Sequence, residues 1–142
     1  AAIGTVQADR IGDFHARRQH NFDRLYAGLR TYEEYLVLPK AYPDAEPAWF
    51  AFPLTVRGGV VRSELVAWLE TSLIETREIF SGNILRQPAY RDVMHRVQGN
   101  LQQSDVVMRD TFFIGVYPGL TDEMLDFVLD RFREFFRSRG LS

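Results

Sequence analysis

Apolar residues recur at helical spacing at both ends of the chain. Residues 1–30 are predicted to form a helix, and the glycines within it allow a break near Gly12. A second long helix is predicted to begin after Thr121, whose hydroxyl suits the N-cap position, and to end at Gly140. Acidic residues in its first turn and arginines toward its end match the helix dipole. The apolar stripe of this last helix comprises Leu125, Val128, Leu129, Phe132, Phe135 and Phe136.

Three stretches between these helices are rich in β-branched and aromatic residues and predict strands. They cover residues 49–56, 74–80 and 112–117. Pro53 indicates that the first strand lies at an edge or contains a bulge, and prolines make residues 36–48 a surface loop. Further helices are predicted over residues 64–71, 89–97 and 104–110, the last with Ser104 as its cap. These elements indicate an α+β fold in which a small, mostly antiparallel three-stranded sheet carries helices on one face.

Composition excludes several classes of protein. The chain has 142 residues, which suits a single domain over residues 1–142, and its formal net charge of −2 argues against a nucleic-acid-binding protein. Because cysteine is absent, no disulfide, thiolate metal site or cysteine nucleophile is expected. The longest apolar stretch, residues 48–56, is far shorter than a membrane-spanning helix. Without a signal-peptide pattern at its start, the chain is expected to belong to a cytoplasmic protein.

The residues that carry chemistry do not form a complete catalytic apparatus. His15 and His20 are five positions apart, which is not the spacing that brings two imidazoles to one metal, so no metal site is expected. No serine has the context of a nucleophile elbow. The sole lysine, Lys40, lies among prolines and should stay hydrated, whereas a Schiff-base lysine is desolvated in a pocket. We therefore expect no catalytic residue in this chain.

The richest polar segment runs from residue 77 to residue 87. Its candidate binding residues are Arg77, Ser81, Gly82, Asn83, Arg86 and Gln87. Side-chain amides donate to and accept from sugar hydroxyls, while arginine forks suit phosphate or carboxylate. One interpretation is a site for a ligand that carries hydroxyls and phosphate. The other is a structural loop whose polar groups satisfy one another, and composition alone does not choose between them.

Several strings in the sequence are distinctive. They are Ala1-Ala2-Ile3-Gly4, Ala16-Arg17-Arg18, Asn21-Phe22, Ile74-Glu75-Thr76-Arg77, Phe80-Ser81-Gly82-Asn83, Arg86-Gln87-Pro88, Arg96-Val97, Asp105, Met108 and the run from Thr111 to Leu120. Together they resemble the small domain of the DegT/DnrJ/EryC1/StrS sugar aminotransferase family, over essentially the whole chain. Within that family they are most similar to the nucleotide-4-keto-6-deoxyhexose 3-dehydrases of lipopolysaccharide biosynthesis.

This resemblance implies the C-terminal small domain of a fold-type I enzyme, whose preceding large domain binds pyridoxal or pyridoxamine phosphate. It implies a nucleotide-sugar substrate, C-3 deoxygenation of a CDP- or GDP-linked 4-keto-6-deoxyhexose for O-antigen synthesis, and a homodimer. The catalytic base would be an upstream histidine. Some members also use an iron–sulfur cluster on upstream cysteines and an iron–sulfur flavin reductase. The six candidate residues between Arg77 and Gln87 would then lie near the cofactor and the sugar nucleotide.

Two other interpretations stay open. A sugar aminotransferase of the same family would share this domain, and the residue at the upstream position of the cofactor-binding lysine would distinguish the two. A free-standing binding module is the other, although the start at Ala1 lacks a capping residue. As a separated small domain the chain should be inactive alone. It should also self-associate, because Trp49, Phe50 and Phe52 place rings on both faces of a thin sheet.

Overall fold

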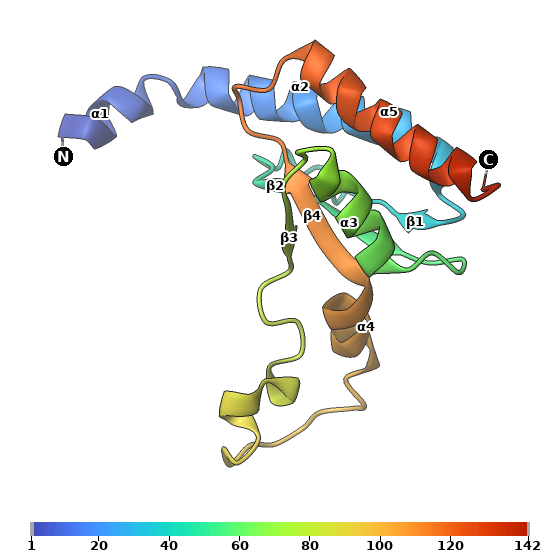
Figure 1. Ribbon diagram of the computed structural model, residues 1–142. Coiled ribbons are helices and arrows are strands. Elements are labelled where there is room, and N and C mark those ends of the chain that lie inside the picture. The colour runs from blue at the N-terminus through green and yellow to red at the C-terminus, as the bar shows by residue number, and fades with distance from the viewer. Residues whose placement is uncertain (1, 142) are drawn as a thin grey trace.

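The long helices predicted at the two ends of the chain are both confirmed in the computed structural model, which describes residues 2–141 (Figure 1). The helices are α1 (Ala2–Ala8), α2 (Ile11–Leu29), α3 (Arg62–Thr71), α4 (Gln102–Asp110) and α5 (Asp122–Ser138), with 3-10 turns η1 (Arg30–Tyr32), η2 (Ile84–Arg86) and η3 (Pro88–Tyr90). The first helix breaks at residues 9–10, close to the break expected at Gly12. The uncapped start expected at Ala1 lies outside the described residues.

The ends of α5 follow the sequence signals. The Thr121 side chain accepts a hydrogen bond from the backbone N–H of Met124 at 3.3 Å, which satisfies one of the free donors of the first turn. Gly140, two residues after the helix, has a φ of +68°, a left-handed conformation that glycine adopts without steric cost. Both predicted ends are therefore confirmed.

The sheet has four strands rather than the three predicted, and every pair is antiparallel. The strands are β1 (Leu36–Val37), β2 (Ala51–Val56), β3 (Thr76–Glu78) and β4 (Thr111–Gly115), in the order β1-β2-β4-β3. The missed strand, β1, has only two residues, too few to show an alternating pattern, and it lies at the start of the segment predicted as a loop. The α+β class with an antiparallel sheet is confirmed.

Pro53 can lie within β2 because of how short β1 is. β1 pairs only with Thr55 and Val56, so the half of β2 that contains Pro53 has a neighbouring strand on one side only. Proline lacks an N–H and is tolerated where one side of a strand makes no ladder bonds. The predicted edge position therefore holds for this half of the strand.

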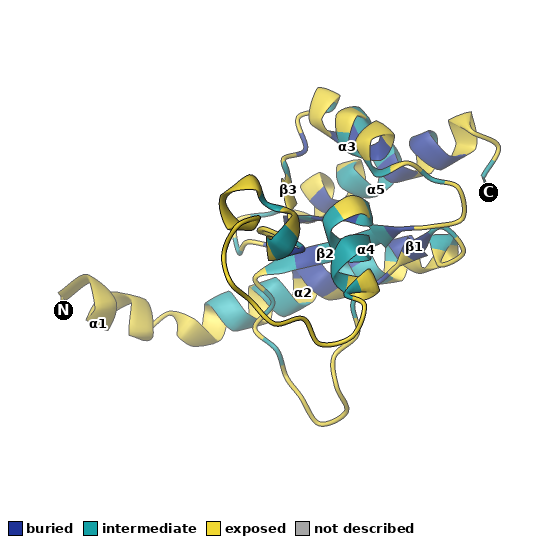
Figure 2. Cartoon of the chain, turned by 90° about the horizontal axis from the view of Figure 1, so that it is seen from below, coloured by how far each residue is buried: buried dark blue, intermediate teal, exposed yellow. Residues whose placement is uncertain are grey.

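One face of the sheet forms the core. Phe52, Leu54 and Val56 of β2 are buried and alternate with half-buried residues, and Phe112 and Ile114 of β4 lie in the same core cluster. The helices α2, α3 and α5 complete that cluster with Leu25, Leu29, Leu65, Leu69, Leu125, Phe132, Phe135 and Phe136. Burial of each such side chain contributes roughly 1.5–3 kcal/mol, so the core supplies most of the favourable free energy of folding. α1 and the segment 79–101 are mainly exposed (Figure 2).

Two predictions for residues 89–110 are corrected by the structure. The helix expected over residues 89–97 is wrong: the single turn η3, opened by Pro88, is followed by irregular chain. A short helix needs an apolar face to bury, and the apolar residues here stay largely exposed, Met94 at 97%. Ser104 is not a cap, because α4 already begins at Gln102, whose backbone N–H donates to Asn100 Oδ1 at 3.1 Å.

Candidate functional site

The loop of residues 81–87, which holds five of the six candidate residues, closes on itself. The buried Asn83 caps η2 by accepting a hydrogen bond from the backbone N–H of Leu85 at 3.1 Å. The side-chain amide of Gln87 donates to the backbone carbonyl of Ser81 at 3.0 Å. These bonds satisfy polar groups of Asn83 and Gln87 within the loop, as the structural interpretation expects. Ser81, whose hydroxyl takes no part in these two bonds, is exposed.

A carboxylate from α4 joins the loop to the rest of the fold. Asp105 Oδ1 accepts hydrogen bonds from Asn83 Nδ2 at 2.7 Å and from Arg86 Nε at 3.0 Å, and Oδ2 accepts one from the Arg86 terminal nitrogen at 2.9 Å. The hydrogen bond from Arg86, followed by that from Asn83, lowers the pKa of Asp105 to about 2. The contact with Asp105 raises the pKa of Arg86 in turn. Among the candidates, Asn83 and Arg86 are thus brought together by a residue outside the predicted set.

Gly82 lies where no other residue fits. Its φ is +56°, and a Cβ added there would lie 2.5 Å from Met108 Cβ and 2.7 Å from Met108 Cα. The second distance involves backbone, which cannot rotate away as a flexible side chain would. The loop therefore rests directly on α4, and glycine is required for this contact.

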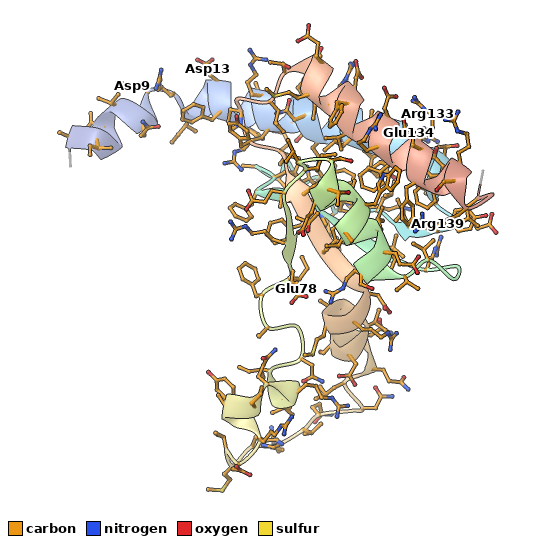
Figure 3. The ribbon with its side chains drawn as sticks, viewed as in Figure 1. Asp9, Asp13, Glu78, Arg133, Glu134 and Arg139 are labelled. Carbon is orange, nitrogen blue, oxygen red and sulfur yellow. The ribbon has the colours of Figure 1, made fainter. Side chains whose placement is uncertain are left out.

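Arg77 is separate from the loop. It lies in β3 opposite Phe113, its side chain is 68% exposed, and its ion pair is with Glu75, two residues earlier, at 2.5 Å. One residue further on, Glu78 ends β3 where the chain leaves the sheet toward the loop (Figure 3), and its carboxylate forms an ion pair with Arg62 at 3.0 Å. The structure gives Arg77 no interaction with residues 81–87 among the contacts of the described residues. Arg77 belongs instead to a groove beside the sheet.

That groove has a volume of about 880 Å³ and is lined mostly by apolar side chains. It runs between β3, the end of β4 and the start of α5, and Phe50, Leu73, Phe113, Tyr117 and Phe127 contribute to its walls. Leu73 is 95% exposed, and Phe50, 72% exposed, packs edge-on against Phe113 with ring centroids 6.0 Å apart. The apolar surface expected from the sequence is therefore present for Phe50, whereas Phe52 is fully buried.

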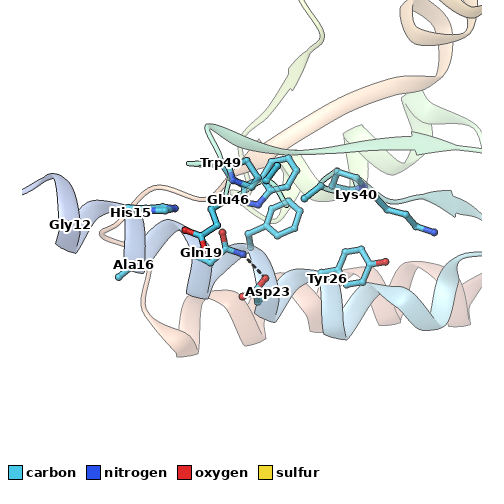
Figure 4. A pocket seen from close by; sticks show the side chains of 14 residues that line it. Gly12, His15, Ala16, Gln19, Asp23, Tyr26, Lys40, Glu46 and Trp49 are labelled. Atoms are coloured by element: carbon cyan, nitrogen blue, oxygen red, sulfur yellow. Dashed lines mark hydrogen bonds between the residues drawn. The ribbon is translucent and has the colours of Figure 1, made fainter. Parts of the chain in front are cut away.

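The ring of Trp49 was also expected to add to the exposed apolar surface, but it stacks on the ring of Phe22 with centroids 4.0 Å apart. Both residues line a second hollow, of about 660 Å³, between α2 and residues 39–49 (Figure 4). Gln19 and Asp23 line it from the helix and are joined by a hydrogen bond of 2.9 Å. This hollow has no signal in the sequence, because a loop and a helix that are far apart in the chain form it together.

The remaining chemical candidates occupy ordinary positions. Lys40 lies at the margin of the second hollow as an exposed residue. His20 Nε2 is 2.7 Å from Asp122 Oδ1, which lowers the pKa of Asp122. Across residues 2–141 there is no group of three histidine, aspartate or glutamate side chains that could hold a metal ion. In the same range no helix is long and apolar enough to cross a membrane.

The sequence of the chain is similar to a known family and to individual proteins. The profile of the DegT/DnrJ/EryC1/StrS aminotransferase family matches residues 1–133. The chain is 46% identical over 138 residues to the lipopolysaccharide biosynthesis protein RfbH of Salmonella typhimurium, covering 96% of this chain and 32% of that protein. It is 42% identical over 137 residues to the dTDP-4-dehydro-2,6-dideoxy-D-glucose 3-dehydratase of Saccharopolyspora spinosa, covering 95% and 29%. The chain thus spans about a third of the length of these relatives.

Solved structures share the fold. The E. coli GDP-4-keto-6-deoxy-D-mannose-3-dehydratase with bound hydrated PLP superposes with a TM-score of 0.83 at 23% identity, covering 92% of this chain and 33% of that one. An aminotransferase from Psychrobacter cryohalolentis superposes with a TM-score of 0.84 at 15% identity, covering 96% and 38%. At these identities the similarity establishes the fold, which dehydratases and aminotransferases have in common.

Proposed function

The chain belongs to the DegT/DnrJ/EryC1/StrS aminotransferase family, and on that premise we propose that it is the C-terminal domain of a longer sugar-nucleotide 3-dehydratase. The reaction is removal of the C-3 hydroxyl of a nucleotide-linked 4-keto-6-deoxyhexose, with pyridoxal or pyridoxamine phosphate as cofactor. The two curated relatives above 40% identity support this, one a 3-dehydratase by name and the other a lipopolysaccharide biosynthesis protein. Since the chain spans about a third of each, the rest of the enzyme would supply the catalytic groups.

The observation that carries the proposal is the fixed loop of residues 81–87. It holds the Gly-Asn string and the Arg-Gln part of the Arg-Gln-Pro string, both of which resemble the dehydrases, and it is held on α4 through Asp105 and Met108. A preorganised loop that exposes a hydroxyl and a guanidinium edge suits a ligand with hydroxyls and phosphate. In this role the loop binds and orients the sugar nucleotide, and Arg77 adds an exposed positive charge at the sheet edge.

The donors of this chain fit a supporting contact to the cofactor and do not fit a covalent one. Lys40 is exposed, whereas a lysine that binds pyridoxal phosphate is desolvated. The exposed Arg77 guanidinium and the Ser81 hydroxyl are of the kind that hold phosphate and sugar oxygens. When bound, the cofactor supplies an electron sink for breaking the bond at C-3. An iron–sulfur cluster would need cysteines, which this chain lacks, so that prediction concerns the rest of the enzyme.

Three further statements stay predictions: a homodimer and an iron–sulfur flavin reductase as electron donor, which the resemblance implies, and a cytoplasmic location. A sugar aminotransferase is the second candidate function, because the matching family is described as an aminotransferase family and an aminotransferase shares the fold. A free-standing binding module is the third. Its support is that residues 2–141 enclose a core of their own, built from the sheet and three helices.

The test compares the longer protein with the isolated chain. Each is incubated with CDP-, GDP- and dTDP-linked 4-keto-6-deoxyhexoses, cofactor, an amino acid as amino donor and a reductant, and the products are analysed by mass spectrometry. We expect the longer protein to give a product that has lost the C-3 oxygen and the isolated chain to give none. Transfer of an amino group to C-4 would establish the aminotransferase instead. Turnover by the isolated chain would refute the assignment as a supporting domain.

A further inference from the structure

We propose that Asp105 is a positioning residue for the nucleotide sugar, an inference that rests on the function proposed above. Asp105 acts through Arg86 and Asn83 and does not itself touch the ligand. Its role is to hold the guanidinium of Arg86 in one orientation, so that the outer edge of that group meets the diphosphate of the substrate.

The geometry around Asp105 fixes the orientation of Arg86. The carboxylate receives two parallel hydrogen bonds from the guanidinium, at 3.0 and 2.9 Å, which defines the plane of that group more strictly than a single contact would. A guanidinium has five N–H donors, and Asp105 takes two of them. The Arg86 side chain remains 63% exposed while it is paired. The donors on its outer edge are therefore presented to a ligand without rearrangement.

The same carboxylate also fixes the backbone that carries Arg86. Its third hydrogen bond comes from Asn83 Nδ2, and the oxygen of that amide caps η2 by accepting from Leu85. Asn83 is only 4% exposed, so neither of its polar ends is available to a ligand. Asp105 thus holds both the side chain of Arg86 and, through Asn83, the turn from which that side chain extends.

α4 transmits this position to the core. Asp105 and Met108 are three residues apart and so lie on one face of α4, and the loop contacts both through Asn83 and Gly82. α4 ends at Asp110 and β4 begins at the next residue, Thr111, in an interior strand of the sheet. The loop is consequently placed relative to the sheet by a short, continuous path rather than by the exposed chain of residues 88–101.

The test uses Asp105→Asn in the longer protein, with Asp110→Asn as the matched control. The first variant keeps the shape of the side chain, removes its charge and turns an amide donor toward the guanidinium. Asp110 lies on the same helix but pairs with the adjacent Arg109 at 2.6 Å, so its loss should not affect the loop. We expect Asp105→Asn to raise KM for the nucleotide sugar about 10- to 100-fold, with a smaller change in kcat, and Asp110→Asn to change neither. Asp105→Glu, which keeps the charge, should recover part of the loss.

Three results would overturn the proposal. A fall in kcat with KM unchanged would mean that the substitution lowers the fraction of folded enzyme, which is a structural role. An unchanged KM would mean that Arg86 does not need Asp105. A lowered KM would mean that Asp105 competes with the phosphate instead of positioning its partner.

Failure of the proposed function would be recognised separately. If the longer protein had no dehydratase activity, the inference would be decided by calorimetric binding of the nucleoside diphosphates CDP, GDP and dTDP. We expect the dissociation constant to rise about 10- to 100-fold for Asp105→Asn relative to Asp110→Asn. Equal affinities for the two variants, or no binding by the parent protein, would refute the positioning role.

Discussion

Substitution of Gly82 by alanine tests whether the loop of residues 81–87 is held by direct contact with α4. A non-glycine residue at a φ of +56° costs about 1–2 kcal/mol. The added Cβ would also lie 2.5 and 2.7 Å from Met108 Cβ and Cα, and overpacking of this kind typically costs about 1–3 kcal/mol. Together these give a local destabilisation of at least about 2 kcal/mol, which corresponds to a roughly 30-fold larger equilibrium constant for opening of the loop.

Amide hydrogen exchange measures that opening directly. The N–H groups of Leu85, Arg86 and Gln87 are hydrogen-bonded within the loop, to Asn83 Oδ1 and to the carbonyls of Asn83 and Ile84. In Gly82→Ala we expect these three amides to exchange at least about 30-fold faster, while amides of β2 and β4 keep their rates because the core is untouched.

Gly99→Ala is the matched control for backbone strain. Gly99 also has a positive φ, +73°, in the same exposed segment, but a Cβ there would meet nothing within 4 Å. It should leave exchange within the loop unchanged. Equal effects of the two substitutions on the loop amides, or no effect of either, would show that contact with Met108 does not hold the loop.

Three further outcomes can be measured. Arg86→Ala in the longer protein should lower kcat/KM about 10- to 100-fold, and unchanged steady-state kinetics would make the loop purely structural. The pKa of Asp105 is depressed from 3.8 to about 2, so the contribution of its carboxylate to loop stability is complete above pH 3.8 and is lost as the pH falls through about 2. Over that pH range, exchange of the loop amides should accelerate in the parent chain and should accelerate less in Asp105→Asn. Phe52→Ala should lower the free energy of unfolding by about 3–5 kcal/mol in denaturant titrations, because Phe52 is fully buried. Phe50→Ala should change the free energy of unfolding little and should weaken the self-association seen by light scattering, because Phe50 is exposed. An apparent mass of the parent chain that does not change with concentration would refute that association.

The candidate site shows how far sequence reasoning reaches. The residue types in the segment 77–87 identified six candidates, but the carboxylate that joins two of them lies elsewhere in the chain. Asp105 is 22 residues from Asn83 and 19 from Arg86, and nothing in local spacing links them. The folded chain shows that the two interpretations of the loop are compatible, because Asn83 is satisfied internally while Arg86 is paired and still exposed.

The sequence by itself determined the elements whose signals are local and repeated. α5 could be placed from its stripe, its Thr121 cap and Gly140, and β2 and β4 from runs of aromatic and β-branched residues, because these patterns arise from helical and strand geometry. Only the tertiary structure decided the conformation of segments whose sequence signal is short or weak and which depend on contacts with distant residues. β1 forms because its two residues pair with the end of β2. Residues 91–97 stay irregular because no other part of the described residues 2–141 covers their apolar side chains. A segment too short to be stable alone takes the conformation that its long-range contacts supply.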